Sequence, residues 1–124
     1  MGLDMYAYVA AKEYDHNSES DSRELAYWRK HPNLHGWFES LWERKGKPNT
    51  SSVNATFNGI ELELTWEDLD ALEHDVTNEI LPATSGFFFG TPADSHYKES
   101  DLKFIRAARA EIFTGLRVFY NSSW

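Results

Sequence analysis

A stripe of large apolar side chains follows Pro32, and it constrains the fold of this chain more than any other feature. Its members recur at intervals of three and four residues: Leu34, Trp37, Phe38, Leu41 and Trp42. The residue before a proline is biased away from the helical backbone, whereas proline itself fits the first position of a helix. The pattern therefore predicts an amphipathic helix that begins at Pro32, ends near Gly46 and buries an aromatic face.

Four other segments are predicted to be β-strands. Leu3–Ala10 is apolar or aromatic at almost every position, which predicts a strand buried on both faces. Glu24–Lys30 is a second extended segment, and Leu116–Trp124 is the last strand. The turn signal Asn58-Gly59 precedes a half-solvated strand. In that strand, apolar residues alternate with acids, in the order Ile60, Glu61, Leu62, Glu63 and Leu64.

Two further helices are predicted from their caps and stripes. Thr65 to Asp68 resembles a capping box, and it opens a helix that Pro82 ends. The buried stripe of this helix is Trp66, Leu69, Leu72, Val76 and Ile80. Ser100 is expected to cap the third helix, and Gly115 to stop it. The buried face of the third helix is Leu102, Ile105, Ala108, Ile112 and Phe113.

The order of these elements predicts a single α+β domain over residues 1–124. Its sheet has about four strands, is mixed or mainly antiparallel, and is packed by three helices. The segment Ala83–Tyr97 shows no strand or helix period. A structureless loop longer than about 12 to 15 residues is more often functional than idle.

The composition excludes several classes of chemistry. The chain has no cysteine, which removes disulfides, thiolate nucleophiles and thiolate metal sites. Twenty acidic residues against 12 Lys and Arg give a net charge of -8, which disfavours nonspecific nucleic-acid binding. No glycine-rich phosphate loop is present, and we expect no cofactor. The N-terminal segment lacks the apolar run of a signal peptide or membrane span, so we expect a cytoplasmic protein without a membrane partner.

One set of residues has the chemistry of a small-ligand pocket. Tyrosine and tryptophan are natural walls, and a carboxylate, an arginine and imidazoles are natural polar contacts. The candidate ligand-binding residues are Asp4, Tyr6, Tyr27, Trp28, Arg29, His31 and His35. Such a set would suit an anionic ligand, with Arg29 and His35 as its contacts. Asp4 stands in an otherwise apolar strand, where a buried carboxylate must be paired, and Arg29 and Arg117 are its candidate partners. The alternative interpretation of Asp4 is a catalytic acid in a cleft.

The two histidines near Pro32 allow three interpretations. His31 precedes the predicted helix and His35 lies about one turn further along, so the two imidazoles are spaced to share a metal. They could equally supply a general base in an anion pocket, where the cations Arg29 and Lys30 would hold an anionic substrate. The third interpretation is structural, with both rings satisfied by backbone partners. A metal would need a third ligand, for which only loop residues are candidates, and we expect no metal site.

Two segments are candidates for a partner-binding surface. Residues 61–79 contain eight acids and no Lys or Arg. We expect a continuous acidic surface there, although acids in the first turn of a helix also suit its dipole. Its members are Glu61, Glu63, Glu67, Asp70, Glu73 and Glu79. The second segment is the aromatic run Phe87, Phe88 and Phe89 between two glycines, which is expected to bend sharply and cover an apolar edge.

Five motifs in fixed order give the chain a family resemblance. They are Met1-Gly2-Leu3-Asp4-Met5-Tyr6, Tyr27-Trp28-Arg29-Lys30, Leu34-His35-Gly36-Trp37-Phe38, the stretch from Leu81 to Gly90, and Tyr120-Asn121-Ser122-Ser123-Trp124. The set resembles a family of small proteins of tailed bacteriophages and prophages and spans nearly the whole chain. The resemblance implies a phage origin and a place of action in the host cytosol, and it implies no particular reaction.

Two classes of function follow from these observations. The first is a non-enzymatic phage accessory protein that binds a host or phage macromolecule. The second is a protein or enzyme that binds a small anionic ligand in an aromatic-walled pocket. A nucleophile, base and orienting group at recognisable spacing are absent from the sequence, which favours the binding protein. The sequence leaves the oligomeric state open.

Overall fold

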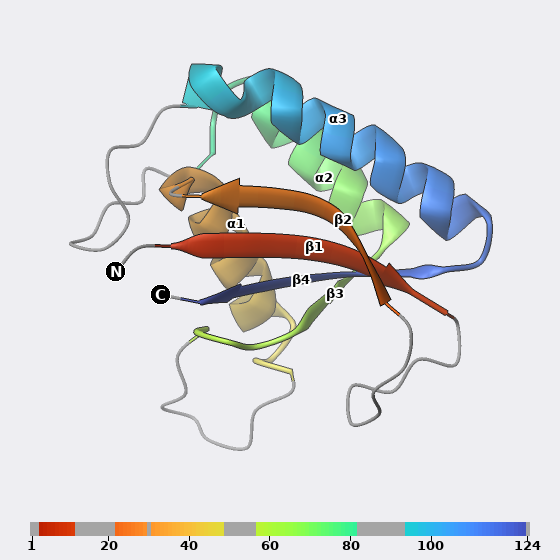
Figure 1. Ribbon diagram of the computed structural model, residues 1–124. Helices are drawn as coiled ribbons and strands as arrows, with labels where there is room; N and C mark the ends of the chain where they lie inside the picture. The colour runs from red at the N-terminus through yellow and green to blue at the C-terminus, as the bar shows by residue number, and fades with distance from the viewer. Residues whose placement is uncertain (1–2, 12–21, 30, 49–56, 82–93, 124) are drawn as a thin grey trace.

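The computed structural model describes residues 3–11, 22–29, 31–48, 57–81 and 94–123 (Figure 1). The elements follow in the order β1 (Asp4–Ala10), β2 (Ser22–Arg29), α1 (Pro32–Arg44), β3 (Leu62–Leu64), α2 (Trp66–Thr77), α3 (Asp94–Phe113) and β4 (Arg117–Ser123). The strands form one sheet in which every pairing is antiparallel. The predicted α+β fold, with four strands and three helices in the described residues, is confirmed.

Strand β1 lies inside the sheet, whose order is β2-β1-β4-β3. Tyr6 is opposite Tyr27 of β2 on one side and Asn121 of β4 on the other. An irregularity between Ala7 and Tyr8 shifts the β1–β2 register, so that Tyr8 is opposite Glu24. Side chains alternate between the two faces of a strand, and this register therefore gathers tyrosines from two strands on one face of the sheet.

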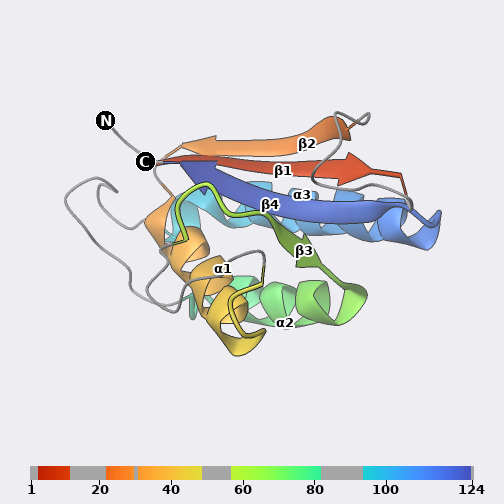
Figure 2. The same ribbon diagram turned by 90° about the horizontal axis from the view of Figure 1, so that it is seen from below.

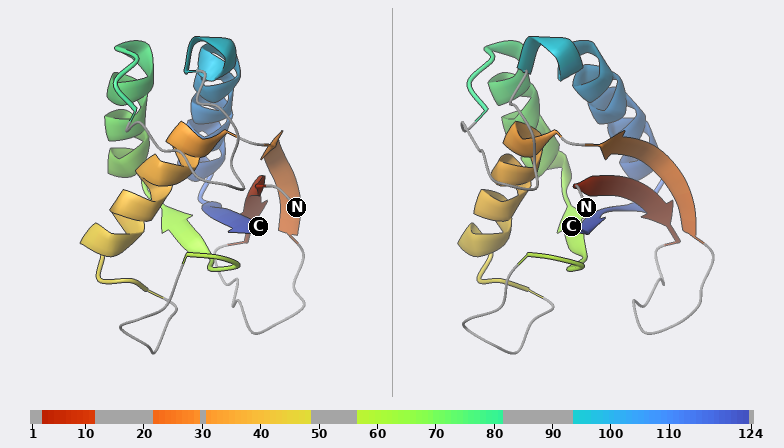
Figure 3. Two further views of the ribbon diagram at one scale, coloured as in Figure 1. Left: turned by 90° about the vertical axis from the view of Figure 1, so that its left-hand side faces the viewer. Right: turned by 60° about the vertical axis from the view of Figure 1, so that its left-hand side comes forward.

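The three helices lie on one side of the sheet (Figures 1, 2 and 3). We call the covered side the inner face. It contributes Met5, Ala7, Trp28, Val118 and Tyr120 to the core. The predicted stripe of α1 packs there and is confirmed, because all five of its members are buried. Phe38 of α1 stacks on Tyr120 with ring centroids 4.1 Å apart, which joins the helix to the sheet.

The opposite side, which we call the outer face, is not covered by a helix in the described ranges (Figure 3). Our prediction that β1 is buried on both faces is therefore wrong. Met5, Ala7 and Val9 are buried, whereas Asp4, Tyr6 and Tyr8 are only half-buried. The sequence pattern misled because tyrosine is apolar enough for a core and polar enough for a surface.

The start of α2 agrees with the sequence and its end does not. Thr65 and Asp68 form the predicted capping box, each side chain accepting from the backbone N–H of the other. The helix stops at Thr77, well before Pro82. Glu79 adopts a left-handed backbone with φ of 54°, a conformation that ends helices.

Three residues assigned to buried stripes are exposed. Trp66 retains 40% exposure, Ile80 55% and Phe113 84%. Trp66 is at the first position of α2 and Ile80 is beyond its last turn. Phe113 follows the buried Phe104 by nine residues, which is 2.5 helical turns, and it therefore points to the opposite side of α3.

Helix α3 begins earlier than predicted. It starts at Asp94, so Ser100 is inside the helix and the predicted cap is wrong. Ile105 and Ala108 are buried as expected, and Phe104 and Asp101 join them. Ala83–Tyr97 was expected to lack regular structure, but its last four residues are helical. Within the described ranges, the helices are too short or too polar to cross a lipid bilayer.

Two tryptophan substitutions distinguish the buried and exposed stripe positions. Trp42 is 2% exposed, so Trp42→Ala should lower the free energy of unfolding by about 3 to 5 kcal/mol. Trp66→Ala removes a half-exposed ring and the contact of that ring with the Arg109 guanidinium at 5.8 Å, and should cost about 1 kcal/mol. Urea denaturation of both variants checks this, and equal losses would contradict the assigned exposures.

Candidate functional site

The seven candidate ligand-binding residues do not come together in one site. Asp4, Tyr6, Tyr27 and Arg29 project from β1 and β2 on the outer face of the sheet. The other three are buried, in the core and at the start of α1: Trp28, His31 and His35. The sheet itself separates the two groups. In particular, Arg29 and His35 are on opposite sides of it and do not form the anion contact that the sequence suggested.

The buried group is organised by Asp101 of α3, which is 1% exposed. Its carboxylate accepts a hydrogen bond from Trp28 Nε1 at 3.0 Å. His31 Nε2 donates to the second oxygen at 2.8 Å, because a carboxylate can only accept. These contacts tie α3 to the end of β2 and to the residue before α1. We overlooked Asp101, although it lies on the same helix face as Phe104 and Ile105, where an acid requires a partner.

His35 belongs to a separate buried pair. Its Nδ1 is 2.7 Å from the hydroxyl of Tyr120, and both residues are inside the core. Burial lowers the pKa of His35 from 6.5 to about 4, and burial also raises the pKa of Tyr120 well above its ordinary value. Both groups are therefore neutral at pH 7. The environment of the pair is that of a packed aromatic core, with the ring of Phe57 next to both.

On the outer face, Asp4 is partly exposed, with 38% of its side chain accessible, and our prediction of a buried carboxylate is wrong. The Tyr27 hydroxyl donates to it at 2.7 Å, and this hydrogen bond raises the pKa of Tyr27. Arg29 Nε is 3.9 Å from Oδ1 of Asp4, and Arg29 is one of the two partners that we predicted for this carboxylate. The other candidate, Arg117, forms two hydrogen bonds with Glu63 instead.

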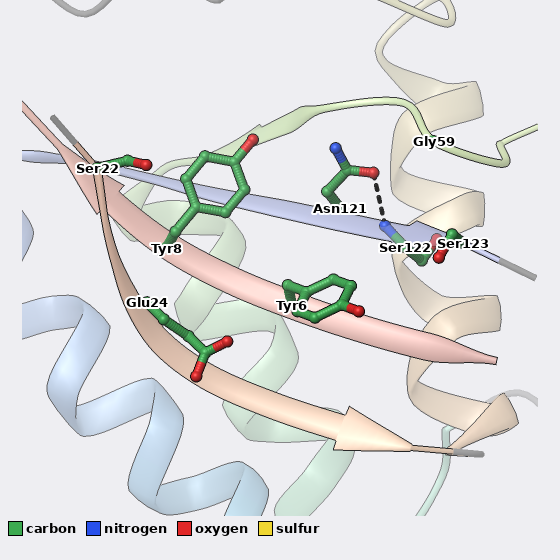
Figure 4. Close-up of a pocket in the computed structure, with 8 residues that line it drawn as sticks. All are labelled: Tyr6, Tyr8, Ser22, Glu24, Gly59, Asn121, Ser122 and Ser123. Carbon is green, nitrogen blue, oxygen red and sulfur yellow. Dashed lines mark hydrogen bonds between the residues drawn. The ribbon is translucent and has the colours of Figure 1, made fainter. Parts of the chain in front are cut away.

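Next to this group, a groove of about 540 Å³ opens on the outer face (Figure 4). We call it the tyrosine groove, and its lining residues are Tyr6, Tyr8, Ser22, Glu24, Gly59, Asn121, Ser122 and Ser123. Figure 4 shows Tyr6 and Tyr8 projecting from β1, with Glu24 of β2 on one flank and Asn121 of β4 on the other. The volume is within the range of about 300 to 1,000 Å³ that is usual for ligand sites.

Each aromatic wall of the tyrosine groove packs against a second aromatic ring. The Tyr6 ring packs against Tyr27, with centroids 5.2 Å apart. The Tyr8 ring stacks on Phe119 at 5.6 Å, and its hydroxyl donates to Glu61. These contacts hold both rings in place without covering the groove. Sequence analysis identified Tyr6 but missed Tyr8, Glu24 and Asn121, because only the strand register places these three side by side.

The predicted continuous acidic surface is largely neutralised by basic residues from elsewhere in the chain. Arg109 of α3 bonds to Asp70 at 2.5 Å and to Glu73 at 2.9 Å, and it lowers the pKa of Glu73. Glu63 is paired with Arg117, and Glu61 accepts from Tyr8. Glu79 is 3.7 Å from Lys98 Nζ. Glu67 is exposed, and within the described ranges it is the one member of the set that has no ion pair or side-chain hydrogen bond. Helix α3 and strand β4 supply the cations that residues 61–79 lack, and composition along the chain cannot reveal these pairings.

Two other predictions concern residues or side chains that the structure does not describe. Phe87, Phe88 and Phe89 are outside the described residues. The same holds for the side chains of the loop residues considered as third metal ligands, which are Asp15, His16, Asp94 and His96. Within the described ranges, no three histidine or acidic residues are grouped as a metal site would require.

Comparisons with models of protein families, with curated proteins and with solved structures find no match to this chain. The function must therefore be argued from the geometry of the chain itself.

Replacing the buried carboxylate tests its role as a junction. Asp101→Ala leaves the buried Trp28 Nε1 and His31 Nε2 without their acceptor and should destabilise the fold by about 3 to 5 kcal/mol. The matched control is Glu99→Gln, an exposed position on the same helix, which should change stability by less than about 0.5 kcal/mol. Thermal and urea unfolding measure both, and a small loss in Asp101→Ala would refute the junction.

His35 makes a separate prediction about pH. Between pH 6.5 and about 4 the unfolded chain protonates this imidazole and the folded chain does not, so stability falls as the pH is lowered through this window. The loss approaches about 3 kcal/mol. His35→Gln should remove this component, whereas the exposed control His74→Gln should retain it. The measurement is the difference in unfolding free energy between pH 7 and pH 5, and identical pH dependence in all three proteins would contradict the lowered pKa.

Proposed function

We propose that this protein is a non-enzymatic binding protein that contacts a macromolecule through the outer face of its sheet. The observation that carries the proposal is the tyrosine groove, a concave site on a sheet face that no described helix covers. Binding sites combine rigid aromatic side chains with a few polar groups that fix orientation, and the lining of the groove has this composition.

The composition of the outer face supports a macromolecular partner. Tyr27 keeps 48% exposure and lies beside Tyr6, so the aromatic surface continues past the rim of the groove. Tyrosine is enriched at protein interfaces because it offers large contact area at a low cost in conformational entropy. The groove is also open rather than enclosed, as a site for part of a larger molecule requires.

The placement of the histidines supports binding over catalysis. His31 and His35 are the two candidates for a general base, and they are 0% and 1% exposed. A general base must come within hydrogen-bond reach of the proton that it removes. The tyrosine groove lies on the other side of the sheet from both imidazoles, and its eight lining residues in the described ranges include one acid, Glu24, and no histidine.

The five sequence motifs complete the proposal. We assign the protein to the tailed-bacteriophage family that these motifs resemble, and we expect it to act in the host cytosol on a host or phage protein. Small accessory proteins of this kind act by occupying a partner, and a preformed groove on a rigid sheet suits that mode of action because it requires little rearrangement.

A capture experiment with paired variants tests the outer face. Tagged wild-type protein is incubated with lysate of infected host cells, and Tyr6→Ala is compared with Phe113→Ser. Tyr6→Ala removes a groove wall and should lose the captured partner. Phe113 is 84% exposed on α3, away from the groove, so Phe113→Ser should retain the partner.

The variants should fold like the wild type because Phe113 is exposed and Tyr6 is half-buried outside the hydrophobic core. Circular dichroism checks this. Loss of the partner in Phe113→Ser with retention in Tyr6→Ala would move the contact to the helices. Retention in both, or no specific capture by the wild type, would refute the outer face as a contact surface.

A further inference from the structure

We propose that the tyrosine groove recognises an arginine side chain on an extended segment of the partner, with Glu24 as the anion that binds the guanidinium. This inference rests on the proposed function, since it names the chemistry that the outer face would recognise. The inference follows from three features of the groove. They are the carboxylate of Glu24, the rings of Tyr6 and Tyr8, and the side-chain amide of Asn121.

The carboxylate of Glu24 is available to a ligand. Within the described ranges it forms no hydrogen bond or ion pair, although arginines precede and follow it on β2. Arg23 Nη2 bonds to Glu111 of α3 at 2.8 Å, and Arg29 pairs with Asp4. Among the described residues that line the groove, Glu24 is also the only charged one. A site with one uncompensated carboxylate, in a chain of net charge -8, attracts cations.

The aromatic rings favour arginine over a compact cation. Glu24 is opposite Tyr8 in the β1–β2 register, so the carboxylate and the Tyr8 ring are neighbours on one face. A guanidinium is planar and weakly hydrated. It stacks on aromatic rings while its edge donates two parallel hydrogen bonds to a carboxylate. Tyr6 and Tyr8 are both backed by second rings, and the stacking surface is therefore preformed.

The amide of Asn121 supplies the opposite polarity. Its Oδ1 accepts from the backbone N–H of Ser122 at 2.7 Å, which fixes the orientation of the amide and directs the NH₂ group away from that bond. Figure 4 shows this nitrogen on the β4 side of the groove. An amide NH₂ is a donor, and the partner group that suits it is a backbone carbonyl.

The spacing of the two polar groups sets the length of the ligand. Glu24 and Asn121 flank β1 on opposite sides and are offset by two residues along it. With strands about 4.8 Å apart and a rise of about 3.4 Å per residue, their Cα atoms are about 12 Å apart. Three to four residues of extended chain cover that distance. One arginine at the Glu24 end and one carbonyl at the Asn121 end therefore fit a single extended segment.

The test uses two blocked pentapeptides, acetyl-Ser-Ser-Arg-Ser-Ser-amide and the same peptide with citrulline in place of arginine. Citrulline keeps the shape of the side chain and replaces the cation by a neutral urea. Each is titrated into isotopically labelled full-length protein to about 10 mM, and NMR shifts give the site and the Kd. We expect the arginine peptide to shift the signals of Tyr6, Tyr8, Glu24 and Asn121, and the citrulline peptide to bind at least fivefold more weakly.

Two charge-matched variants complete the test. Glu24→Gln should weaken the arginine peptide by about fivefold, the upper range for a solvent-accessible charge pair, and should make binding nearly independent of salt. Glu99→Gln removes one acid from α3 and should bind as the wild type does. Equal binding of the two peptides, unchanged affinity in Glu24→Gln, or no shift at the groove with the arginine peptide would each overturn the inference.

These outcomes are separable from the capture experiment. Tyr6→Ala can lose the partner while Glu24→Gln binds the arginine peptide like the wild type and the citrulline peptide binds like the arginine peptide. In that case the outer face is a contact surface that recognises something other than arginine. If Tyr6→Ala retains the partner and the arginine peptide still binds at the groove, the arginine site exists and the proposed function of the outer face is wrong.

Discussion

The packing of the helices against the sheet depends most on the hydrogen bonds to the buried carboxylate of Asp101. An ionised group is costly to place in a core, and this one is tolerated because Trp28 and His31 both donate to it. The three residues come from α3, β2 and the residue before α1, elements far apart in the sequence. Satisfying one carboxylate therefore fixes how the last helix and the first helix approach the same edge of the sheet.

That arrangement places the three described helices on the inner face. It leaves the outer face to polar and aromatic side chains such as Tyr6, Tyr8 and Tyr27. An antiparallel sheet tolerates one solvated face, so the open face costs the fold nothing. Tyrosine suits such a face because its ring packs against a neighbour while its hydroxyl remains hydrated or bonded, as Tyr27 does with Asp4. The tyrosine groove is thus a product of one-sided packing combined with the register shift after Ala7.

Charge follows the same logic of compensation between distant segments. The excess of acids in residues 61–79 suggests a repulsive surface, yet Arg109 and Arg117 reach three of those acids from α3 and β4. Lys45 follows α1, and its ammonium group donates hydrogen bonds to Asp68 and to the backbone carbonyl of Glu63. The second bond satisfies a carbonyl on the edge strand β3. Within the described ranges Glu24 has no such bond or ion pair, and unlike Glu67 it lines the groove.

Local patterns in the sequence were enough to predict the α+β class, the α1 stripe, the capping box at Thr65 and the last strand. Each of these features depends on periodicity along the chain or on residues within one turn of each other. Tertiary structure decided which face of β1 is covered, which acids are paired, and that Phe113 and Trp66 are exposed, since these depend on where a neighbouring element ends. It also decided the candidate site. Tyr8, Glu24 and Asn121 carry no shared motif, and only the strand register brings side chains from β1, β2 and β4 to one groove.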